Sequence, residues 1–416
     1  MDLSDRDGGA SVTRAQLSIA NHERLVKISR PLSVSTYDVV TADFCYHHPY
    51  VPSLETTNVI TMCLCSTGTG AGKTAHAIAL GKRLIRDGYR VEYTATVVGP
   101  EETTCAGCPN PAEFVRTALA LGPRRQPYFP ISLHTALATP DDIDSSLPAR
   151  RLAALQEEIA PRTDVFLVEA GGTPLEGMLL GLSAPEIVRI LGAQTLLIAG
   201  YSGDTVVDSV LGTQSLLGAP LVGTAIVGIP PAQVDSTQQT IRTILERRGI
   251  RVLGMLPEDR LLAAVTVDEL VSVLHGTYQC CDSRGRDLVQ HLMIGAMEPA
   301  HALNYFQRQS HKAVITGGDR PAIHLAALET ATCCLILTGG FDPVPDVLSR
   351  AQELDVPLVT VDVDTLTAVE CAQRLFTNAR FRQEKKVQRV VDLFDRHFDY
   401  ASLYRAMGLH ARSLSK

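Results

Sequence analysis

The stretch from Ser66 to Thr74, STGTGAGKT, decides the fold, because it joins an apolar run to a helical pattern. The apolar run Asn58–Cys65, NVITMCLC, predicts a buried strand, and the residues from Ala71 to Asp87 predict a helix. Glycines at alternate positions let the loop backbone aim its N–H groups at phosphate oxygens, and the helix N-terminus adds positive potential. This order of strand, glycine-rich loop and helix predicts a phosphate-binding site.

The residues of this loop have separate expected roles. Lys73 can neutralise the β- and γ-phosphates of a nucleotide, and Thr74 can ligate Mg²⁺. The strict pattern GxxxxGK[ST] has glycine where this chain has Thr67, and a chance glycine-rich turn is the alternative interpretation. The flanking strand and helix favour the phosphate site. We expect nucleotide contacts from Thr67, Gly68, Thr69, Gly70, Ala71, Gly72, Lys73 and Thr74.

A second apolar run, VFLVEAGG at Val165–Gly172, ends in the carboxylate Glu169. The carboxyl ends of parallel strands face the ligand crevice, so we expect Glu169 beside the phosphate loop, where it would share the catalytic work with Lys73. A carboxylate there can bind Mg²⁺ directly or through water, and a solvated strand-end glutamate is the alternative. The spacing does not separate the candidates for a second metal carboxylate, which are Glu101, Glu102 and Glu113.

Short β-rich runs alternate with helical patterns from Asn58 onward, which predicts an α/β fold with a parallel sheet. A shorter series of the same kind follows, and it predicts a second, smaller α/β domain. We expect a helix at 284–296 in that series and a closing helix at 380–398. The expected division is an N-terminal extension 1–57, a phosphate-loop domain 58–275, a second domain 284–400 and a tail 401–416.

Two glycine pairs follow predicted strands in the last third of the chain. Gly317 and Gly318 precede Asp319, which is a plausible helix N-cap, and Gly339 and Gly340 follow the next strand. Both pairs, together with Asp319, are candidates for a second-domain ligand site, and ordinary tight connections are the alternative.

Cys105 and Cys108 form a CxxC motif in a loop that is rich in proline. Two thiolates offer half of a tetrahedral zinc or iron–sulfur site, or a redox dithiol. No other CxxC is present, so a metal would need ligands from a second subunit or from distant cysteines. Unligated thiols are the simplest interpretation of this pair.

The composition excludes several classes of protein. The 416 residues are 45% hydrophobic and 20% charged, which is typical of a globular chain of two or three domains. The formal net charge of −7 argues against a nucleic-acid partner. No apolar run is long enough to cross a bilayer, and the acidic start does not resemble a signal peptide, so we expect a cytoplasmic protein without a membrane partner.

Eight motifs together resemble a known arrangement, a dethiobiotin-synthetase-like P-loop domain followed by a DRTGG domain. This arrangement occurs at the N-terminal side of many phosphate acetyltransferases. The motifs run in the family order over residues 58 to about 400. They are TGTGAGKT, LVEAGG, LGAQTLLIAG, VLGMLPEDRLLAAVTVDEL, IGAMEP, ITGGDRPAIHLAALE, LILTGG and DVPLVTVDVDT.

The resemblance implies ATP and Mg²⁺ as cofactors, Thr74 and Glu169 as metal residues, and a homodimer. Dethiobiotin synthetases carry an asparagine that helps to recognise adenine where this chain has Val227 and Gly228, so ATP over GTP is an expectation. The acetyltransferase domain that normally follows has no counterpart before Lys416, so we do not expect acetyl transfer.

Three functions compete at this stage. The first is an ATP-dependent enzyme that activates a carboxylate or carbamate of a small molecule by phosphoryl transfer. The second is a nucleotide-binding regulator or scaffold that acts on a partner enzyme through its DRTGG domain. The third is an ATPase that carries a metal cluster on Cys105 and Cys108 across a dimer. We prefer the first.

Overall fold

The computed structural model describes residues 59–98, 111–122, 131–138, 144, 146–218, 221–377, 381 and 383–410. All of them belong to one compact unit, Tyr50–Lys416. In these ranges no helix is both long enough and apolar enough to span a bilayer.

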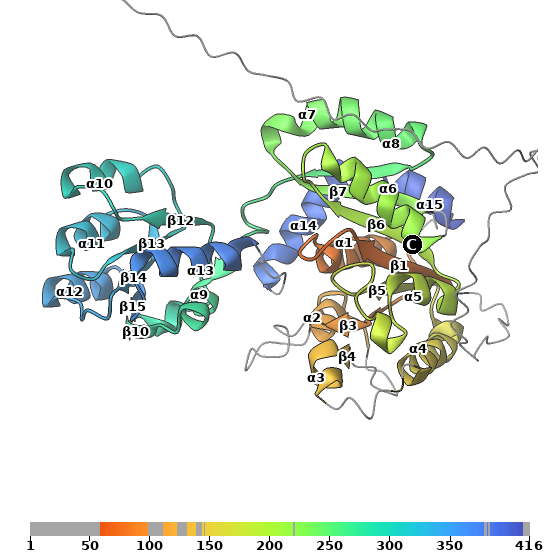
Figure 1. Cartoon of the computed structure of the whole chain (residues 1–416), viewed down its shortest axis with the longest axis horizontal. Helices are drawn as coiled ribbons and strands as arrows, with labels where there is room; N and C mark the ends of the chain where they lie inside the picture. The colour runs from red at the N-terminus through yellow and green to blue at the C-terminus, as the bar shows by residue number, and fades with distance from the viewer. Residues whose placement is uncertain are drawn as a thin grey trace, which may run out of the picture. The chain divides into compact units, whose positions relative to one another are not determined.

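The first sheet has six parallel strands in the order β2, β5, β1, β6, β7 and β8, and Figure 1 labels the central strands β5, β1, β6 and β7. The structure therefore confirms the predicted parallel α/β fold. Strand β1 lies between β5 and β6, so the loop after β1 emerges beside the end of β5. The bounds are β1 Ile60–Ser66, β2 Val91–Ala95, β5 Val165–Glu169, β6 Gln194–Gly200, β7 Leu221–Ile229 and β8 Val252–Pro257.

Helices cover both faces of this sheet, because alternate residues of the central strand pack into different cores. Met62 and Leu64 of β1 belong to a core with helix α1, whereas Cys63 and Cys65 belong to a core with α4, α5 and α6. Strands β3 and β4 form a short parallel pair. The bounds are α1 Lys73–Arg86, α2 Pro111–Ala118, α3 Leu133–Leu137, α4 Ser146–Ile159, α5 Ala184–Leu191, α6 Thr205–Leu217, α7 Val234–Thr237, α8 Thr243–Arg247, β3 Val97–Val98 and β4 Ile131–Ser132.

The second sheet has five strands in the order β10, β15, β14, β13 and β12, and only the edge strand β10 is antiparallel. Helices α9 and α13 share one of its cores, and α10, α11 and α12 share the other. The bounds are α9 Val267–Leu274, β10 Thr277–Cys280, β12 His291–Ile294, α10 Pro299–Phe306, β13 Lys312–Gly317, α11 Pro321–Leu328, β14 Thr332–Thr338, α12 Pro345–Glu353, β15 Leu358–Val361 and α13 Thr365–Thr377.

The prediction of a helix at 284–296 is wrong. This segment forms β11, Leu288–Val289, and then β12. Strand β11 pairs antiparallel with β9, Val265–Thr266, and β12 pairs parallel with β13. These pairings come from segments about twenty residues away in either direction, so the local apolar period did not reveal them.

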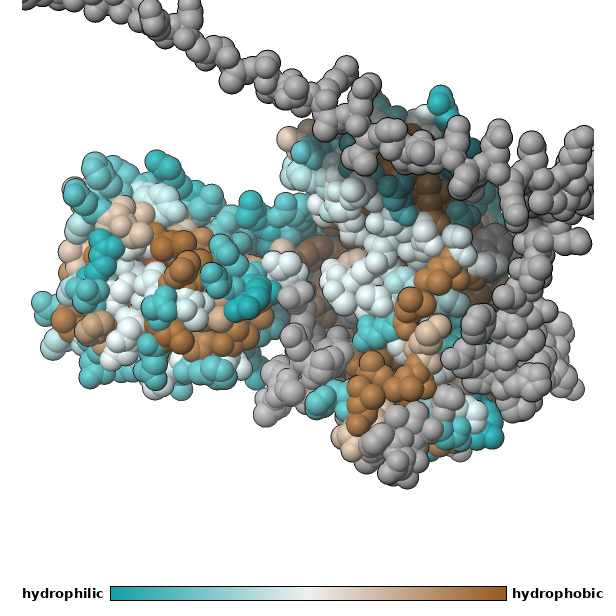
Figure 2. Space-filling view, in the orientation of Figure 1, coloured by the Kyte–Doolittle hydropathy of each residue, from teal (hydrophilic) through white to brown (hydrophobic). Residues whose placement is uncertain are grey.

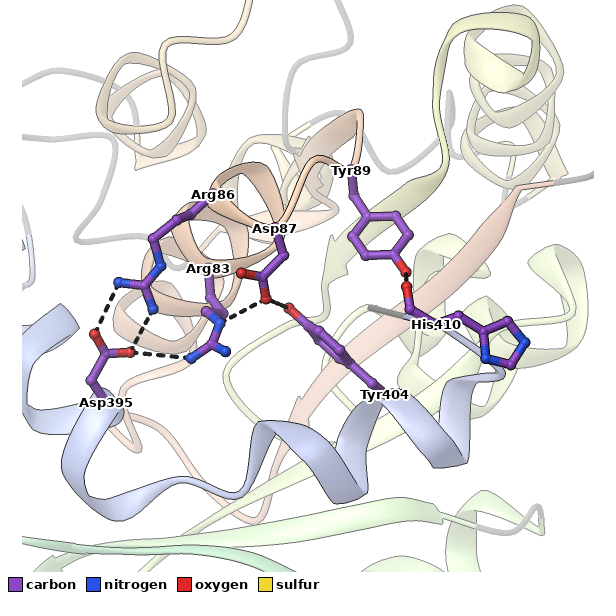
Figure 3. Close-up of polar contacts among 7 residues, drawn as sticks. All are labelled: Arg83, Arg86, Asp87, Tyr89, Asp395, Tyr404 and His410. Atoms are coloured by element: carbon purple, nitrogen blue, oxygen red, sulfur yellow. Dashed lines mark hydrogen bonds and ion pairs between the residues drawn. The ribbon is translucent and has the colours of Figure 1, made fainter. Parts of the chain in front are cut away.

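The chain returns to the first core after the second sheet is complete. Helix α14, Glu384–His397, and helix α15, Tyr400–Met407, bury apolar residues in the core that contains α1. Figure 3 shows the polar part of this contact, in which Asp395 of α14 pairs with Arg86 of α1 (3.1 Å). The sequence had predicted the closing helix but gave no signal for its packing against α1.

Candidate functional site

The glycine-rich loop joins β1 to α1 at the carboxyl edge of the first sheet. Gly70 (φ 73°) and Gly72 (φ 79°) adopt the left-handed backbone conformation that favours glycine. Gly72 is the N-cap of α1, so Lys73 and Thr74 are the first two residues of the helix. The predicted loop therefore ends on a helix N-terminus, where the macrodipole attracts anions.

This loop presents a row of free hydrogen-bond donors. Within the described part of the chain, the N–H groups from Gly68 to Ala75 have no acceptor, whereas the N–H of Thr67 donates to Ile198 O of β6 (3.0 Å). Unpaired N–H groups at a helix N-terminus are the groups that bind phosphate oxygens in proteins. The loop thus has unpaired donors of the kind that an anion requires, and the N–H of Thr67 bonds to β6.

The side chain of Lys73 is buried and lies along the loop. Its Nζ donates to Ser66 Oγ (2.7 Å), and Ser66 Oγ in turn donates to the carbonyl oxygens of Gly68 (2.9 Å) and Gly172 (3.1 Å). Gly172 follows β5, so Ser66 joins the two loops that the sequence singled out. A Cβ atom on Gly172 would lie 2.7 Å from Thr69 Cγ2, which shows how closely the two loops approach.

Glu169, the last residue of β5, lies beside the first turn of α1. Its Oε1 accepts a hydrogen bond from Thr74 Oγ1 (2.9 Å), and its Oε2 accepts one from the hydroxyl of Tyr93 (2.7 Å). Tyr93 is a fully buried residue of β2. The carboxylate is therefore held on both oxygens, with one of them directed at the residue expected to ligate a metal.

A buried histidine lies directly under the loop. His76 Nδ1 donates to Gly72 O (2.9 Å), and His76 Nε2 is buried with no hydrogen-bond partner among the described residues. Burial lowers the pKa of His76 to about 4, because the charged imidazolium is poorly solvated there. The ring contacts Phe394 of α14 edge-on, at 4.5 Å between centroids. His76 thus connects the N-cap of α1 to the returning helix.

Other predicted site residues do not join this cluster or lie outside the described residues. Glu113 is exposed in the first turn of α2. Glu101, Glu102, Cys105 and Cys108 all lie outside the described residues. Among the residues that are described, no three His, Cys, Asp or Glu side chains gather as a metal site.

The two glycine pairs of the second domain come together at the carboxyl edge of its sheet. Gly317 pairs in register with Thr338, and the Gly318 N–H donates to Thr338 O (2.9 Å). Gly339 and Gly340 both have positive φ. The close-packed neighbour of Gly318 is Phe341, whose Cβ would lie 2.7 Å from an added Cβ. These glycines permit a tight junction between two strand ends.

The expected N-cap at Asp319 is wrong. Helix α11 begins at Pro321, its N-cap is Arg320, and no side chain caps it. The guanidinium of Arg320 instead donates to Gly295 O (2.6 Å) and Met297 O (2.5 Å), which fixes the loop after β12.

Apolar residues gather on the face of the second domain that Figure 2 shows.

Sequence reasoning missed three residues of the site. Ser66 is the first residue of the loop, and its hydroxyl seven residues before Lys73 is the signal that could have indicated its role. Tyr93 lay in an apolar strand, where a tyrosine is usually a core residue. His76 had the helical spacing of a buried position, and only its distance of four residues from Gly72 could have indicated the hydrogen bond.

Comparisons with known proteins assign both domains. Residues 61–266 match the family model described as an AAA domain, and residues 269–375 match the DRTGG domain. A phosphate acetyltransferase of Synechocystis sp. is 24% identical over 291 residues, which cover 65% of this chain and 41% of that protein. One from Nitratidesulfovibrio vulgaris is 26% identical over 159 residues, 36% of this chain and 22% of the relative. The chain thus spans less than half the length of either relative.

Two solved structures resemble parts of the chain, both with TM-scores below 0.5. The CBS and DRTGG domains of the regulatory region of Clostridium perfringens pyrophosphatase, complexed with the activator diadenosine tetraphosphate, give 0.25 at 18% identity, over 38% of this chain and 75% of that one. The MinC:MinD complex of Aquifex aeolicus gives 0.34 at 14% identity, over 49% and 84%. From the family models and the curated relatives, the chain combines a dethiobiotin-synthetase-like P-loop domain with a DRTGG domain, and it is homologous to the N-terminal region of phosphate acetyltransferases over about 65% of its length.

Proposed function

We propose that this chain binds ATP with Mg²⁺ at residues 67–74 and transfers the γ-phosphoryl group to a carboxylate or carbamate of a small molecule. The observation that carries the proposal is the meeting of Lys73, Thr74 and Glu169 around a loop of free N–H groups. The P-loop domain supports nucleotide binding. The acceptor class rests on the resemblance to dethiobiotin synthetases.

The oxygens of Thr74 and Glu169 fit a magnesium ion. Thr74 Oγ1 and Glu169 Oε1 are 2.9 Å apart. Mg²⁺ holds oxygen ligands at about 2.0–2.1 Å in octahedral geometry, so two adjacent ligands lie about 2.9 Å from each other. Tyr93 holds the second carboxylate oxygen and keeps Glu169 oriented. A bound Mg²⁺ would supply positive charge to the β- and γ-phosphate oxygens.

The chain's own residues would bind and orient the nucleotide. Lys73 lies buried against the loop, with its ammonium group on Ser66 Oγ, so its charge lies beside the N–H groups that would bind the phosphates. The N–H groups from Gly68 to Ala75 would bind phosphate oxygens without first breaking protein hydrogen bonds. These donors and Lys73 would stabilise negative charge on the transferring phosphoryl group.

Nucleotide binding and turnover test the proposal separately. Isothermal titration with ATP and Mg²⁺ should show binding that Lys73→Ala weakens at least tenfold, which corresponds to about 1.4 kcal/mol. The matched control is Lys385→Ala, because Lys385 is an exposed lysine of α14. A panel of small carboxylates and amines with bicarbonate should contain a compound that stimulates phosphate release by the wild type and not by Lys73→Ala. ATP binding without stimulation of phosphate release by any compound would contradict the proposed enzyme activity.

A nucleotide-dependent regulator is the second candidate function. The packing of α14, which follows the second domain, against the first domain favours it. Helix α14 follows the DRTGG domain directly and packs against α1, the helix that begins at Lys73. A ligand that shifts α13 or α14 would therefore act on the phosphate loop. The regulator predicts that nucleotide binding changes hydrogen exchange in α14, whether or not any acceptor stimulates hydrolysis.

We also propose that the chain is a homodimer. The turn that follows Glu169 exposes three large apolar side chains, Leu175, Met178 and Leu179, and Met178 is 61% exposed. Such a cluster is costly to leave in water and is typical of an interaction surface. Light scattering should give twice the monomer mass, and Met178→Glu should reduce it to the monomer mass if this turn lies in the interface.

A further inference from the structure

Two adjacent cysteines occupy an unusual turn at the edge of the second sheet. Cys280 is the last residue of β10, and Cys281 follows it with φ 60°. A positive φ is uncommon outside glycine, and residues held in such conformations often have a function. Both cysteines are free thiols, and both are partly exposed.

The two thiols face the same segment of backbone. Cys280 Sγ donates to Val356 O (3.7 Å), and Cys281 Sγ donates to Ala351 O (3.8 Å). The acceptors belong to one turn at the end of α12, because the Val356 N–H donates to Ala351 O (3.0 Å). The left-handed conformation of Cys281 is therefore accompanied by two sulfur atoms on the same side of the chain.

A second pair of adjacent cysteines shows that this arrangement does not follow from sequence alone. Cys333 and Cys334 lie inside β14, where Cys334 is completely buried. Cys333 Sγ donates to Leu288 O (3.8 Å), away from any turn shared with its neighbour. Only the pair at 280 and 281, among the described adjacent cysteines, has both thiols partly exposed on one turn.

We propose that Cys280 and Cys281 are a site of reversible oxidation, at which a small-molecule disulfide such as oxidised glutathione converts the two thiols into one disulfide. The Cys280 thiolate attacks one sulfur of the reagent and releases the first thiolate, which takes up a proton. Cys281 then gives up its proton and attacks the Cys280 sulfur, and the second reagent thiol leaves. Two protein thiols are oxidised and one reagent disulfide is reduced to two thiols. This inference is independent of the proposed function.

The covalent geometry makes such a bond easy to reverse. Consecutive Cα atoms lie about 3.8 Å apart across a trans peptide, whereas disulfides usually join Cα atoms about 4.4–6.8 Å apart. The bond would therefore be strained, and strained disulfides are the labile and regulatory ones. Burial and the neighbouring Cys280 raise the pKa of Cys281 to about 12, which keeps Cys281 protonated, so we assign the first attack to Cys280.

Closure of the disulfide would change the edge of the second sheet. It would remove both S–H donors from the carbonyl oxygens of Val356 and Ala351 at the end of α12. It would also draw together the two sulfur atoms at the end of β10. The pairing of β10 with β15 already shifts in register there, between Tyr278 and Cys280. Hydrogen exchange in β10 and β15 should therefore differ between the reduced and oxidised chains.

Mass spectrometry of the full chain tests the proposal. The chain is treated with oxidised glutathione, its remaining thiols are alkylated, and the peptide that contains residues 277–287 is analysed. We expect this peptide to lose two hydrogens and to regain them with dithiothreitol. Cys281→Ser should instead retain glutathione on Cys280, and Cys280→Ser should lose the closure as well. Cys333→Ser is the matched control and should leave the closure unchanged.

Two results would overturn the proposal. One is a wild-type peptide that keeps a stable glutathione adduct, because Cys281 would then be unable to displace it. The other is a peptide that stays fully reduced while the partly exposed Cys371 is modified in the same sample. Circular dichroism of each variant establishes that it is folded, and either serine variant alone is sufficient for the comparison.

Discussion

Phe394→Ala tests whether the C-terminal helices complete the phosphate-loop domain. Phe394 of α14 is only 1% exposed. Its ring stacks on Phe398, at 5.3 Å between centroids, and meets the edge of His76 at 4.5 Å. The substitution removes a large apolar group from between α1 and α14 without touching the loop residues themselves.

The expected cost is large because the side chain is almost fully buried. Truncation of a core phenylalanine to alanine lowers the free energy of unfolding by roughly 3–5 kcal/mol, which includes lost apolar burial and the cavity that remains. We expect a value of about 4 kcal/mol, since two aromatic contacts are lost as well. The matched control is Phe341→Ala, because Phe341 is 51% exposed. It should cost less than about 1 kcal/mol.

Urea unfolding supplies the measurement. The chain has no tryptophan, so the transition is followed by far-UV circular dichroism, and hydrogen exchange of peptides from α1 reports the first domain alone. Phe394→Ala should lower the stability that protects α1, while Phe341→Ala should leave that protection unchanged. Equal effects of the two variants on α1 would refute the reasoning, because α14 would then contribute nothing to the core around the phosphate loop.

Three further predictions concern the loop itself. Burial lowers the pKa of His76 to about 4 in the folded chain, from about 6.5 in the unfolded chain. The contribution of His76 to the free energy of unfolding is therefore full above about pH 6.5 and is lost as the pH falls through the folded pKa. The free energy of unfolding should fall by about 3 kcal/mol over that window, and His76→Asn should flatten the dependence in urea titrations at each pH. Tyr93→Phe removes the donor to Glu169 and should cost about 1 kcal/mol in urea unfolding, and it should weaken ATP binding in calorimetry only when Mg²⁺ is present. Gly172→Ala would place a Cβ atom 2.7 Å from Thr69 Cγ2, and it should lower nucleotide affinity in the same calorimetric assay.

Each of these predictions has a result that contradicts it. A pH dependence that persists in His76→Asn would assign the titration to another group. A loss of ATP affinity in Tyr93→Phe that is equal with and without Mg²⁺ would mean that Tyr93 acts on the loop and not on the metal oxygens. Gly212→Ala is the control for Gly172, because nothing lies within 4 Å of an added Cβ in helix α6, and equal losses for both would remove the steric explanation.

The glycine-rich loop, with the strand before it and the helix after it, could be predicted from the sequence because its signal is local. The glycines, Lys73 and Thr74 lie within nine residues, and the strand before them and the helix after them have strong periods. Glu169 could also be placed, since the ends of parallel strands share one edge of a sheet. The partner of its second oxygen could not be placed, because Tyr93 has the pattern of a core residue and its hydroxyl reaches Glu169 only after the strands have paired.

The failures concern contacts between distant parts of the chain. The segment 284–296 has an apolar period that suits a helix, but pairing with β9 and β13 makes it two strands. Asp395 pairs with Arg86 across 309 residues, and no local pattern on α14 indicates that partner. Propensity and period describe what a segment favours by itself, whereas burial against a distant element decides what it becomes.

The return of α14 also joins the two segments that connect the domains. Lys386 Nζ is buried and donates to Ala264 O (2.7 Å), and Arg389 pairs with Asp259 (2.7 Å). Residues 259–264 precede the DRTGG domain, and α14 follows it. The chain segments that enter and leave that domain are therefore in contact with each other. A buried ammonium is costly to separate from its acceptor, so displacement of one segment requires displacement of the other. Helix α14 also contacts His76 under the phosphate loop, so these contacts join the segments on either side of the DRTGG domain to the helix that begins at Lys73.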